Sequence, residues 1–404
     1  YCWDLYSEVG QWYGEDPERQ ALRRQTLHQL EQGEGERAEM GRLVSRRVVR
    51  RHLATMARLD IDYDLLTHEA AILGLDFFTK AFELLEREQA IHLESSGKTA
   101  GCWVMPLSGS EEFAGLEDPD KVIVGSDGTV TYVGKDIAYQ LWKFGLLGED
   151  FEYRFWDEEE VWETTTSGVR PHPEFGHADR VINVIDARQS YLQKIVRAGL
   201  DALHFPEQAA QSIHFAYEMV TLSPATARAL GYLAEGEADD ARNLDMSGRK
   251  GIGVKADDLM DELESKSREE IATRNRDLPE AELEQLSRQI ATAALRFFMV
   301  KATTNRVIAF DLDEALNFEG ESGPYLQYSA VRALNIKRRL AQAGLPTEID
   351  ADSLSALSAD VWADDLWDLV LSVALIPQRV EMAGETLELC ILARHALELA
   401  QKFH

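Results

Sequence analysis

The sequence has few cysteines, no long apolar run and a shortage of basic residues. Its three cysteines, Cys2, Cys102 and Cys390, are widely spaced and form no Cys-x-x-Cys pair, which predicts a cytoplasmic protein without a disulfide framework or zinc knuckle. The longest apolar run, residues 369–376, falls well short of the roughly 20 residues that span a membrane. With 42 Lys and Arg against 71 Asp and Glu, the net charge is −29, so any polyanionic partner must be met by local basic patches.

A folded core is nevertheless expected from the composition. The 404 residues are 45% hydrophobic and 28% charged, which is typical of a soluble globular chain of two or three domains and excludes disordered and collagen-like classes. The chain begins at Tyr1 rather than Met, and both of its ends lie inside helical patterns. We therefore expect a piece of a longer protein.

The hydrophobic periodicity of the first 240 residues is mixed. Helical patterns extend to about residue 60, and an amphipathic helix is predicted over 75–90. Short strand-like runs follow, and the Asp127-Gly128 pair between two of them predicts a hairpin. The run VINVID (181–186) predicts a buried strand that leads directly into a helix. This order of elements indicates the α/β class.

Beyond residue 240 the pattern is almost wholly helical. The segment 323–344 predicts one long helix, which Gly344 and Pro346 end. Residues 364–401 predict two packed helices, split near Pro377. The coarse prediction is an α/β half followed by a helical bundle, with a boundary near residue 320.

Four polar residues are candidates for binding a small ligand. Tyr132 is predicted to end a strand and Asp136 to open the next helix, while Glu69 lies in YDLLTHEAAIL. A planar guanidinium suits a carboxylate bidentately, so these three side chains together could hold a cation. Gln189 follows the strand 181–186, where ligands of α/β sheets bind. Each also has an ordinary alternative: a helix cap for Asp136, and a solvent-exposed helix residue for Glu69 and Gln189.

A short loop rich in glycine and basic residues suits phosphate. Backbone N–H groups together with Arg and Lys can stabilise phosphate oxygens whose charge changes during a reaction. The alternative is a plain basic surface loop. The residues of this loop are Met246, Ser247, Gly248, Arg249, Lys250 and Gly251.

Arginines gather on one predicted helix, in the segment GRLVSRRVVRRH. Arg42, Arg46 and Arg50 share one helix face, and Arg47 and Arg51 lie beside them. In so acidic a chain this is a candidate for contact with a polyphosphate. The alternative is a solvated face that pairs with nearby carboxylates.

Two aspartates raise a different class of protein as an alternative. The run VIAFDLDEAL places Asp311 and Asp313 after an apolar segment, where they could hold Mg²⁺ in a phosphoaspartate mechanism. A metal-dependent phosphatase requires these aspartates to end a parallel strand, whereas the helical pattern after residue 240 predicts a helical region. This hypothesis stays open as an alternative.

Taken together and in this order, these segments resemble the class I arginyl-tRNA synthetase family. The resemblance covers almost the whole chain, and GPYLQYSAVR and SDGTVTYVGKDIA are its most specific parts. The segments that carry it are LDIDYDLLTHEAAIL, SDGTVTYVGKDIA, the segment around Gln189, MSGRKG, FDLDEALNFEGESGPYLQYSAVRALNIKR and LELCILARHALELAQKFH.

The resemblance implies a fold and a division into domains. The fold is α/β: the C-terminal part of a class I synthetase Rossmann-like catalytic domain, followed by an all-α helical bundle. Residues 1–240 would be the catalytic portion, with a helical insertion and an α/β core. Residues 241–320 would hold the signature loop and a helical connection, and residues 321–404 would begin the anticodon-binding domain.

The resemblance also implies an activity, arginine–tRNA ligation. ATP would activate L-arginine as arginyl-adenylate, and the arginyl group would pass to the 3′ end of tRNA(Arg). Glu69, Tyr132 and Asp136 would bind the arginine guanidinium, Gln189 its amino-acid end, and the loop 246–251 the ATP phosphates. Mg²⁺ would arrive with ATP, no protein-bound metal or membrane is expected, and the protein would be a monomer. The residues implied in tRNA binding are Arg46, Arg47, Arg50, Arg51, Tyr325 and Gln327; for Tyr328 we favour helix packing.

The sequence departs from the family pattern in two ways. Asp245 stands where the class signature usually has Lys, and a carboxylate there would repel ATP's phosphates. No His-x-Gly-His occurs in the 404 residues, so we expect that this chain alone does not form arginyl-adenylate. A non-catalytic, synthetase-like protein that binds amino acid or tRNA therefore remains an alternative.

Overall fold

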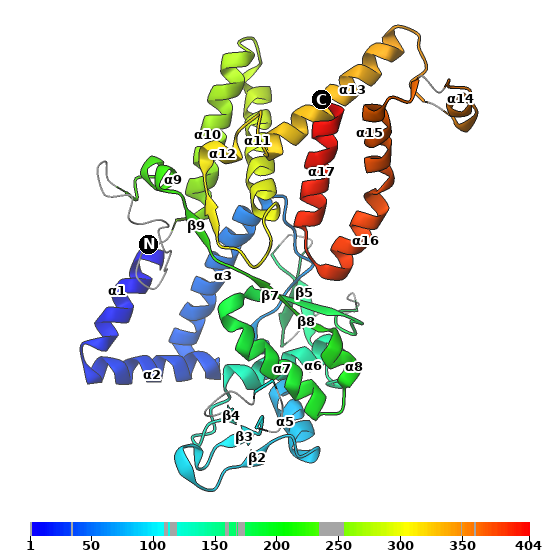
Figure 1. The fold of residues 1–404 in the computed structure, drawn as a ribbon. Coiled ribbons are helices and arrows are strands. Elements are labelled where there is room, and N and C mark those ends of the chain that lie inside the picture. Colours follow the sequence, from blue (N-terminus) through cyan, green and yellow to red (C-terminus); the bar gives the residue numbers. More distant parts are fainter. Residues whose placement is uncertain are drawn as a thin grey trace. The chain divides into compact units, whose positions relative to one another are not determined.

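The computed structural model contains two compact units, each formed by segments that are separate in the sequence. The α/β unit consists of residues 24–46 and 62–217, and the helical unit of residues 1–23, 47–61 and 218–404. Figure 1 shows the elements of both units. The structure describes residues 2–33, 35–108, 112–113, 119–157, 161–166, 168, 174–233, 254–348, 350–358 and 361–404.

The α/β unit packs helices α5, α6 and α7 around one apolar core. Phe77, Ile137, Leu141 and Ile195 are completely buried there. The predicted helix over 75–90 is confirmed as α5. The elements of this unit are β1 (Leu65–Leu66), α4 (Glu69–Gly74), α5 (Phe77–Arg87), β2 (His92–Leu93), the 3₁₀ turn η1 (Gly97–Thr99), β3 (Trp103–Met105), β4 (Lys121–Val124), α6 (Tyr132–Lys143), β5 (Glu152–Phe155), β6 (Trp162–Thr165), β7 (Val181–Asp186), the 3₁₀ turn η2 (Ala187–Gln189), α7 (Ser190–Ala202), α8 (Pro206–Gln211) and β8 (Ser212–Tyr217).

Small sheets surround this core rather than one continuous sheet. Strands β2, β3 and β4 form an antiparallel sheet, β6 pairs with both β1 and β5, and β7 runs parallel to β8. The predicted strand 181–186 and the helix after it are confirmed as β7 and α7. The interpretation of this strand as buried is wrong for one face: Val181 and Asn183 are buried, but Ile182 is 43% and Val184 62% exposed. The sequence does not reveal that buried and exposed residues alternate along β7, because the exposed residues Ile182 and Val184 are themselves hydrophobic.

The predicted hairpin forms its turn but not its second strand. Gly128 adopts a left-handed backbone conformation (φ +82°), and Val124 and Val130 pair across the turn. The prediction that Tyr132 ends a strand is wrong, because Tyr132 is the first residue of α6. The Thr131 hydroxyl accepts a hydrogen bond from the Gly134 N–H and so caps this helix early.

The helical unit is built around the helix pair α10 and α11 and continues into the C-terminal helices. Met260, Leu263, Ala291, Phe298 and Phe310 form its buried core. Its elements are α1 (Cys2–Gly14), β9 (Val220–Leu222), α9 (Pro224–Ala229), α10 (Ala256–Arg274), α11 (Glu280–Val300), β10 (Ile308–Phe310), α12 (Leu312–Ala315), α13 (Gly323–Gln342), α14 (Ala351–Ser355), α15 (Asp364–Ala374), α16 (Ile376–Thr386) and α17 (Cys390–Phe403). The helices α2 (Pro17–Gln32) and α3 (Gly35–Ala57) each have residues in both units.

Two features of the helical unit differ from the sequence prediction. Strand β10 interrupts the helical region and pairs in parallel with β9. Residues 364–401 form three helices rather than two, because the chain breaks both at Leu375, before Pro377 in the first turn of α16, and at Leu387, which is left-handed (φ +59°). Among the described residues, no helix combines the length and apolar character needed to cross a membrane.

Candidate functional site

One face of helix α6 carries two of the four candidate polar residues, Tyr132 and Asp136. Tyr132, Asp136, Tyr139 and Lys143 follow one another at intervals of four, three and four residues, which places them along one face of the helix. The Tyr132 ring is 75% exposed, and the Tyr139 hydroxyl donates to Thr67 Oγ1 at 2.9 Å. Because α6 already begins at Tyr132, the Tyr132 side chain lies on the same helix face as Asp136.

Glu69 comes from a neighbouring helix and meets the same region. It is the first residue of α4, which packs against α6. Its carboxylate accepts a hydrogen bond from Lys135 Nζ at 2.8 Å, and this ammonium lies 5.5 Å from the centre of the Tyr132 ring. The structure thus brings Glu69 and Tyr132 together around a cation, which here is the side chain of Lys135.

Asp136 is electrostatically coupled to this arrangement. Loss of water around its carboxyl raises the pKa of Asp136; the charge of Lys143 lowers it, Glu69 raises it further and Lys135 lowers it, and the balance is a raised pKa. Asp136 and Glu69 repel each other, so a cation bound between these two carboxylates would stabilise the charged form of both.

A buried chain of hydrogen bonds ties α6 to the β7/β8 sheet. Lys143 Nζ donates to Asn183 Oδ1 at 2.8 Å, Asn183 Nδ2 donates to Gln140 Oε1 at 3.4 Å, and Gln140 Nε2 donates to Ser212 Oγ at 2.9 Å. Burial lowers the pKa of Lys143 to about 8, and the charge of Asp136 opposes this change. These contacts hold α6, the helix that carries Tyr132 and Asp136, against the β7/β8 sheet. The spacing of residues along the sequence does not predict these contacts.

Gln189 lies at the carboxyl end of β7, as predicted. It ends the 3₁₀ turn η2 and takes the N-cap position of α7, with an exposed side chain. The structure gives no hydrogen bond between its side chain and those of Glu69, Tyr132 or Asp136. The site therefore joins three of the four predicted ligand-binding residues, and Gln189 belongs to the same unit without contacting them.

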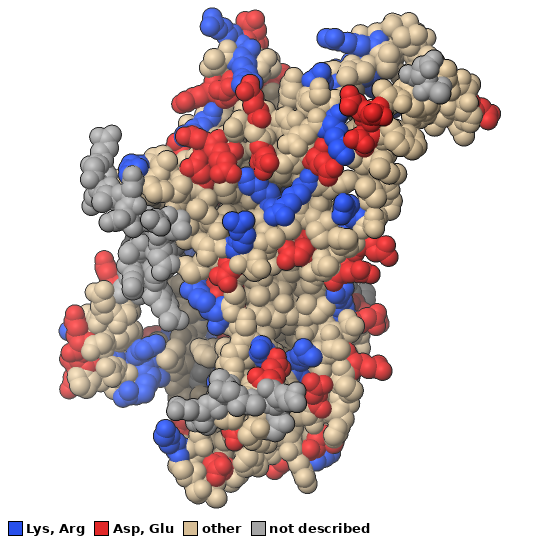
Figure 2. Space-filling model, in the orientation of Figure 1, with Lys and Arg blue, Asp and Glu red and all other residues tan. Residues whose placement is uncertain are grey.

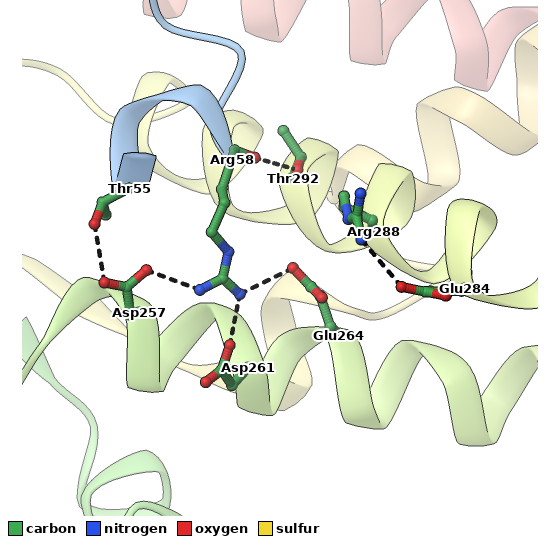
Figure 3. Close-up of polar contacts among 8 residues, drawn as sticks. All are labelled: Thr55, Arg58, Asp257, Asp261, Glu264, Glu284, Arg288 and Thr292. Carbon is green, nitrogen blue, oxygen red and sulfur yellow. Dashed lines mark hydrogen bonds and ion pairs between the residues drawn. The ribbon is translucent and has the colours of Figure 1, made fainter. Parts of the chain in front are cut away.

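The predicted phosphate loop, Met246–Gly251, lies outside the described residues. The helix that follows it, α10, begins at Ala256 with Asp257 and Asp258 in its first turn. Its start is fastened to α3 by Arg58 (Figure 3): the guanidinium contacts Asp257 at 2.8 Å, Asp261 at 2.6 Å and Glu264 at 3.0 Å. Burial acts against the charge of Arg58, but the three carboxylates outweigh it and raise its pKa.

The arginines of the stripe on α3 differ in their exposure to solvent. Arg46 contacts Glu163 at 3.0 Å and Asp157 at 2.5 Å, and its guanidinium lies 4.2 Å from the Trp156 ring. This is the carboxylate-paired alternative, and Glu163 is only 1% exposed. The side chains of Arg47, Arg50 and Arg51 are exposed. On the face drawn in Figure 2, acidic and basic side chains are interspersed.

Tyr325 and Gln327 lie on α13. The Gln327 amide donates to the backbone oxygen of Gln289 on α11 at 3.4 Å, and the Tyr325 ring lies 5.4 Å from that of His404. Tyr328, for which packing is predicted, is largely exposed and stacks on His404 at 5.6 Å. In the structure, Gln327 contributes to contact between helices.

The two aspartates of the phosphatase hypothesis have structural partners. Asp311 does follow a parallel strand, β10, so the prediction of a helical region is wrong here. Its Oδ1 accepts from the backbone N–H groups of Asp313 and Glu314, and its Oδ2 accepts from the Ser223 hydroxyl. Asp313 pairs with Lys266 at 2.8 Å. Asp311 thus has the geometry of a helix cap, and the described part of the chain contains no group of three His, Cys, Asp or Glu side chains that could hold a metal ion.

Comparison with known proteins gives a consistent result over the whole chain. Residues 326–404 match the model of the DALR anticodon binding domain. The chain is 34% identical to arginine–tRNA ligase of Thermococcus kodakarensis over 99% of its length and 36% identical to that of Deinococcus radiodurans over 100%, covering 60% and 63% of those proteins. It is also similar to the solved structure of Thermus thermophilus arginyl-tRNA synthetase, with a TM-score of 0.78 and 32% identity over 98% of this chain and 60% of that one.

The mixed α/β fold and the helical C-terminal region match the class of aminoacyl-tRNA synthetases. Within that class, the chain is homologous over its whole length to arginyl-tRNA synthetases. It spans about 60% of the length of the curated relatives that it matches.

Proposed function

We propose that the chain is part of an arginine–tRNA ligase and contains the region that selects L-arginine. The single observation that supports this most is the cation held by Glu69 and Tyr132 beside Asp136. The names of the relatives, which are arginine–tRNA ligases, point to the same amino acid. The reaction would consume ATP, form arginyl-adenylate and transfer the arginyl group to the 3′ end of tRNA(Arg).

The chemistry of the site favours arginine over lysine. A guanidinium presents parallel N–H donors that match a carboxylate bidentately, and its plane stacks on an aromatic ring. An ammonium is a point charge that leaves one acceptor of such a fork unpaired, and an unpaired acceptor reduces affinity. In this proposal Asp136 and Glu69 accept from the guanidinium, Tyr132 stacks on it, and Gln189 binds the amino-acid end.

The other parts of the reaction are assigned to further segments. Residues 246–251 would stabilise the ATP phosphates while the arginine carboxylate attacks the α-phosphorus, with Mg²⁺ carried by ATP. No protein nucleophile is needed, since positioning and charge stabilisation lower the barrier. Residues 1–240 would be the catalytic portion, 241–320 the connection and 321–404 the start of the anticodon-binding domain. The protein would act as a monomer, with Arg47, Arg50 and Arg51 as tRNA contacts.

Binding of L-arginine to the chain tests the proposal. Isothermal titration calorimetry is expected to detect L-arginine, with L-lysine binding at least about tenfold more weakly because the bidentate contact is lost. The variant Asp136→Asn removes the charge and is expected to weaken arginine binding about tenfold or more. Asp201→Asn, an exposed carboxylate on α7, serves as the matched control. If Asp136→Asn binds arginine as the wild type does, the proposed site is wrong.

A further inference from the structure

Lys135 occupies a position that its sequence context does not explain. Its side chain is only 11% exposed, while that of its partner Glu69 is 57% exposed. Long lysine side chains on a helix surface usually extend into water. Here the ammonium is instead directed to Glu69 Oε1 at 2.8 Å and lies 5.5 Å from the centre of the Tyr132 ring.

The local geometry explains how this arrangement forms. Tyr132 and Lys135 are three residues apart on α6 and therefore neighbours on its surface. Glu69 begins α4, which packs against α6, so its carboxylate faces the same surface. A carboxylate and an aromatic ring around one cation is also what binding of an arginine side chain requires.

We propose that Lys135 is the resident cation of the guanidinium site, and that L-arginine binds by displacing the Lys135 ammonium from Glu69. This inference rests on the proposed function. While the site is empty, Lys135 neutralises Glu69 and limits repulsion between Glu69 and Asp136. When arginine binds, the ammonium moves away from the carboxylate and the guanidinium takes its place.

The exchange sets how strongly an incoming cation must bind Glu69 before it can displace Lys135. An incoming lysine offers Glu69 an ammonium, which is the contact that Lys135 already provides, so the exchange brings no net gain. An incoming arginine offers two parallel N–H donors, which bind a carboxylate more strongly than one ammonium does. Breaking the Lys135–Glu69 pair costs the same free energy whichever ligand enters, so Lys135 lowers both affinities by the same factor, and the preference for arginine comes from the guanidinium contacts.

Calorimetric titration of L-arginine and L-lysine into four forms of the full 404-residue chain tests this. The forms are the wild type, Lys135→Met, Lys135→Arg and Lys98→Met, an exposed lysine outside the site. Lys135→Met is expected to bind arginine about two- to fivefold more tightly, since an ion pair of this exposure is worth up to about 1 kcal/mol. It is expected to bind lysine more tightly by a similar factor, so that the ratio of the two affinities stays close to that of the wild type.

Lys135→Arg tests whether another cation at position 135 restores wild-type binding. Its guanidinium is expected to hold Glu69 at least as firmly as the lysine does, so arginine binding stays at or below the wild-type affinity. Lys98→Met is expected to bind as the wild type. Thermal unfolding of each variant checks the fold, and Lys135→Gln replaces Lys135→Met if the latter is destabilised.

The outcomes separate this inference from the proposed function. If Lys135→Met binds arginine no more tightly than the wild type while Asp136→Asn loses binding, Lys135 is an ordinary ion-pair residue and the proposed function stands. Tighter binding of arginine in Lys135→Met without a similar gain for lysine also overturns the inference, because displacement of the same ammonium costs both ligands equally. If neither the wild type nor Lys135→Met binds arginine, both proposals fail.

Discussion

Lys143 illustrates how the environment of one residue changes its chemistry. It is half-buried at the end of α6, donates to Asn183 and lies 4.4 Å from the centre of the Tyr139 ring. Burial lowers its pKa from 10.5 to about 8, although the charge of Asp136 opposes the change. In the unfolded chain the same amine has its ordinary pKa, so the two states bind protons differently.

This difference predicts how stability depends on pH. Below pH 8 the amine is charged in both states and its burial destabilises the fold, and this cost disappears as the pH rises from 8 to 10.5. We expect Lys143 to contribute a rise of about 1–3 kcal/mol in the free energy of unfolding over this interval. Urea unfolding of the wild type and of Lys143→Met measures it, because the variant lacks the rise. Lys80→Met, an exposed lysine on α5, is the control, and equal pH profiles for all three proteins would contradict the prediction.

At the scale of elements, the space around a glycine shows how closely its helix approaches a neighbouring helix. Gly323, buried at the start of α13, lies against α11, and a Cβ atom there would overlap the carbonyl oxygen of Ala293. Gly384 lies inside α16, and a Cβ atom there would have no neighbour within 4 Å. The same substitution therefore has opposite consequences in the two helices.

We expect Gly323→Ala to lower the free energy of unfolding by about 1–3 kcal/mol, because α13 must shift away from α11. Gly384→Ala is expected to raise it by about 0.5–1 kcal/mol, because alanine favours the helix. Chemical denaturation of both variants against the wild type measures the difference. A stabilising Gly323→Ala would mean that α13 does not pack against α11 as described.

For the whole molecule, the dominant property is the charge of −29. Repulsion among like charges destabilises a compact chain, and salt screens it over a distance of about 8 Å at physiological ionic strength. The melting temperature is therefore expected to rise by a few degrees between about 20 and about 300 mM NaCl at pH 7.5.

The isoelectric point supplies the control for this experiment. Near pH 4.7 the net charge vanishes, so the same change in salt is expected to have a much smaller effect. Differential scanning calorimetry at both pH values makes the comparison. A salt response of equal size at pH 4.7 would assign it to ion effects other than screening.

Most helices could be predicted from the sequence, and several strands could not. The helices α5, α7, α10, α11 and α13 follow from apolar periodicity and from end signals such as Gly344. The strands β5, β6 and β10 are only three or four residues long, and their pairing depends on segments distant in the sequence. The start of α6 was missed because the Thr131 cap competes with the strand pattern of the residues before it.

The sequence by itself determined which kinds of side chain are present and where most of the long helices lie, because periodicity and capping act over a few residues. It therefore indicated the family, the carboxylates Glu69 and Asp136, and the arginine stripe. The tertiary structure decided which charges meet. Arg46 pairs with Glu163, 117 residues away, and Lys135 pairs with Glu69, 66 residues away. Such pairs form only when packing brings separate helices and strands together, and local sequence does not encode that packing.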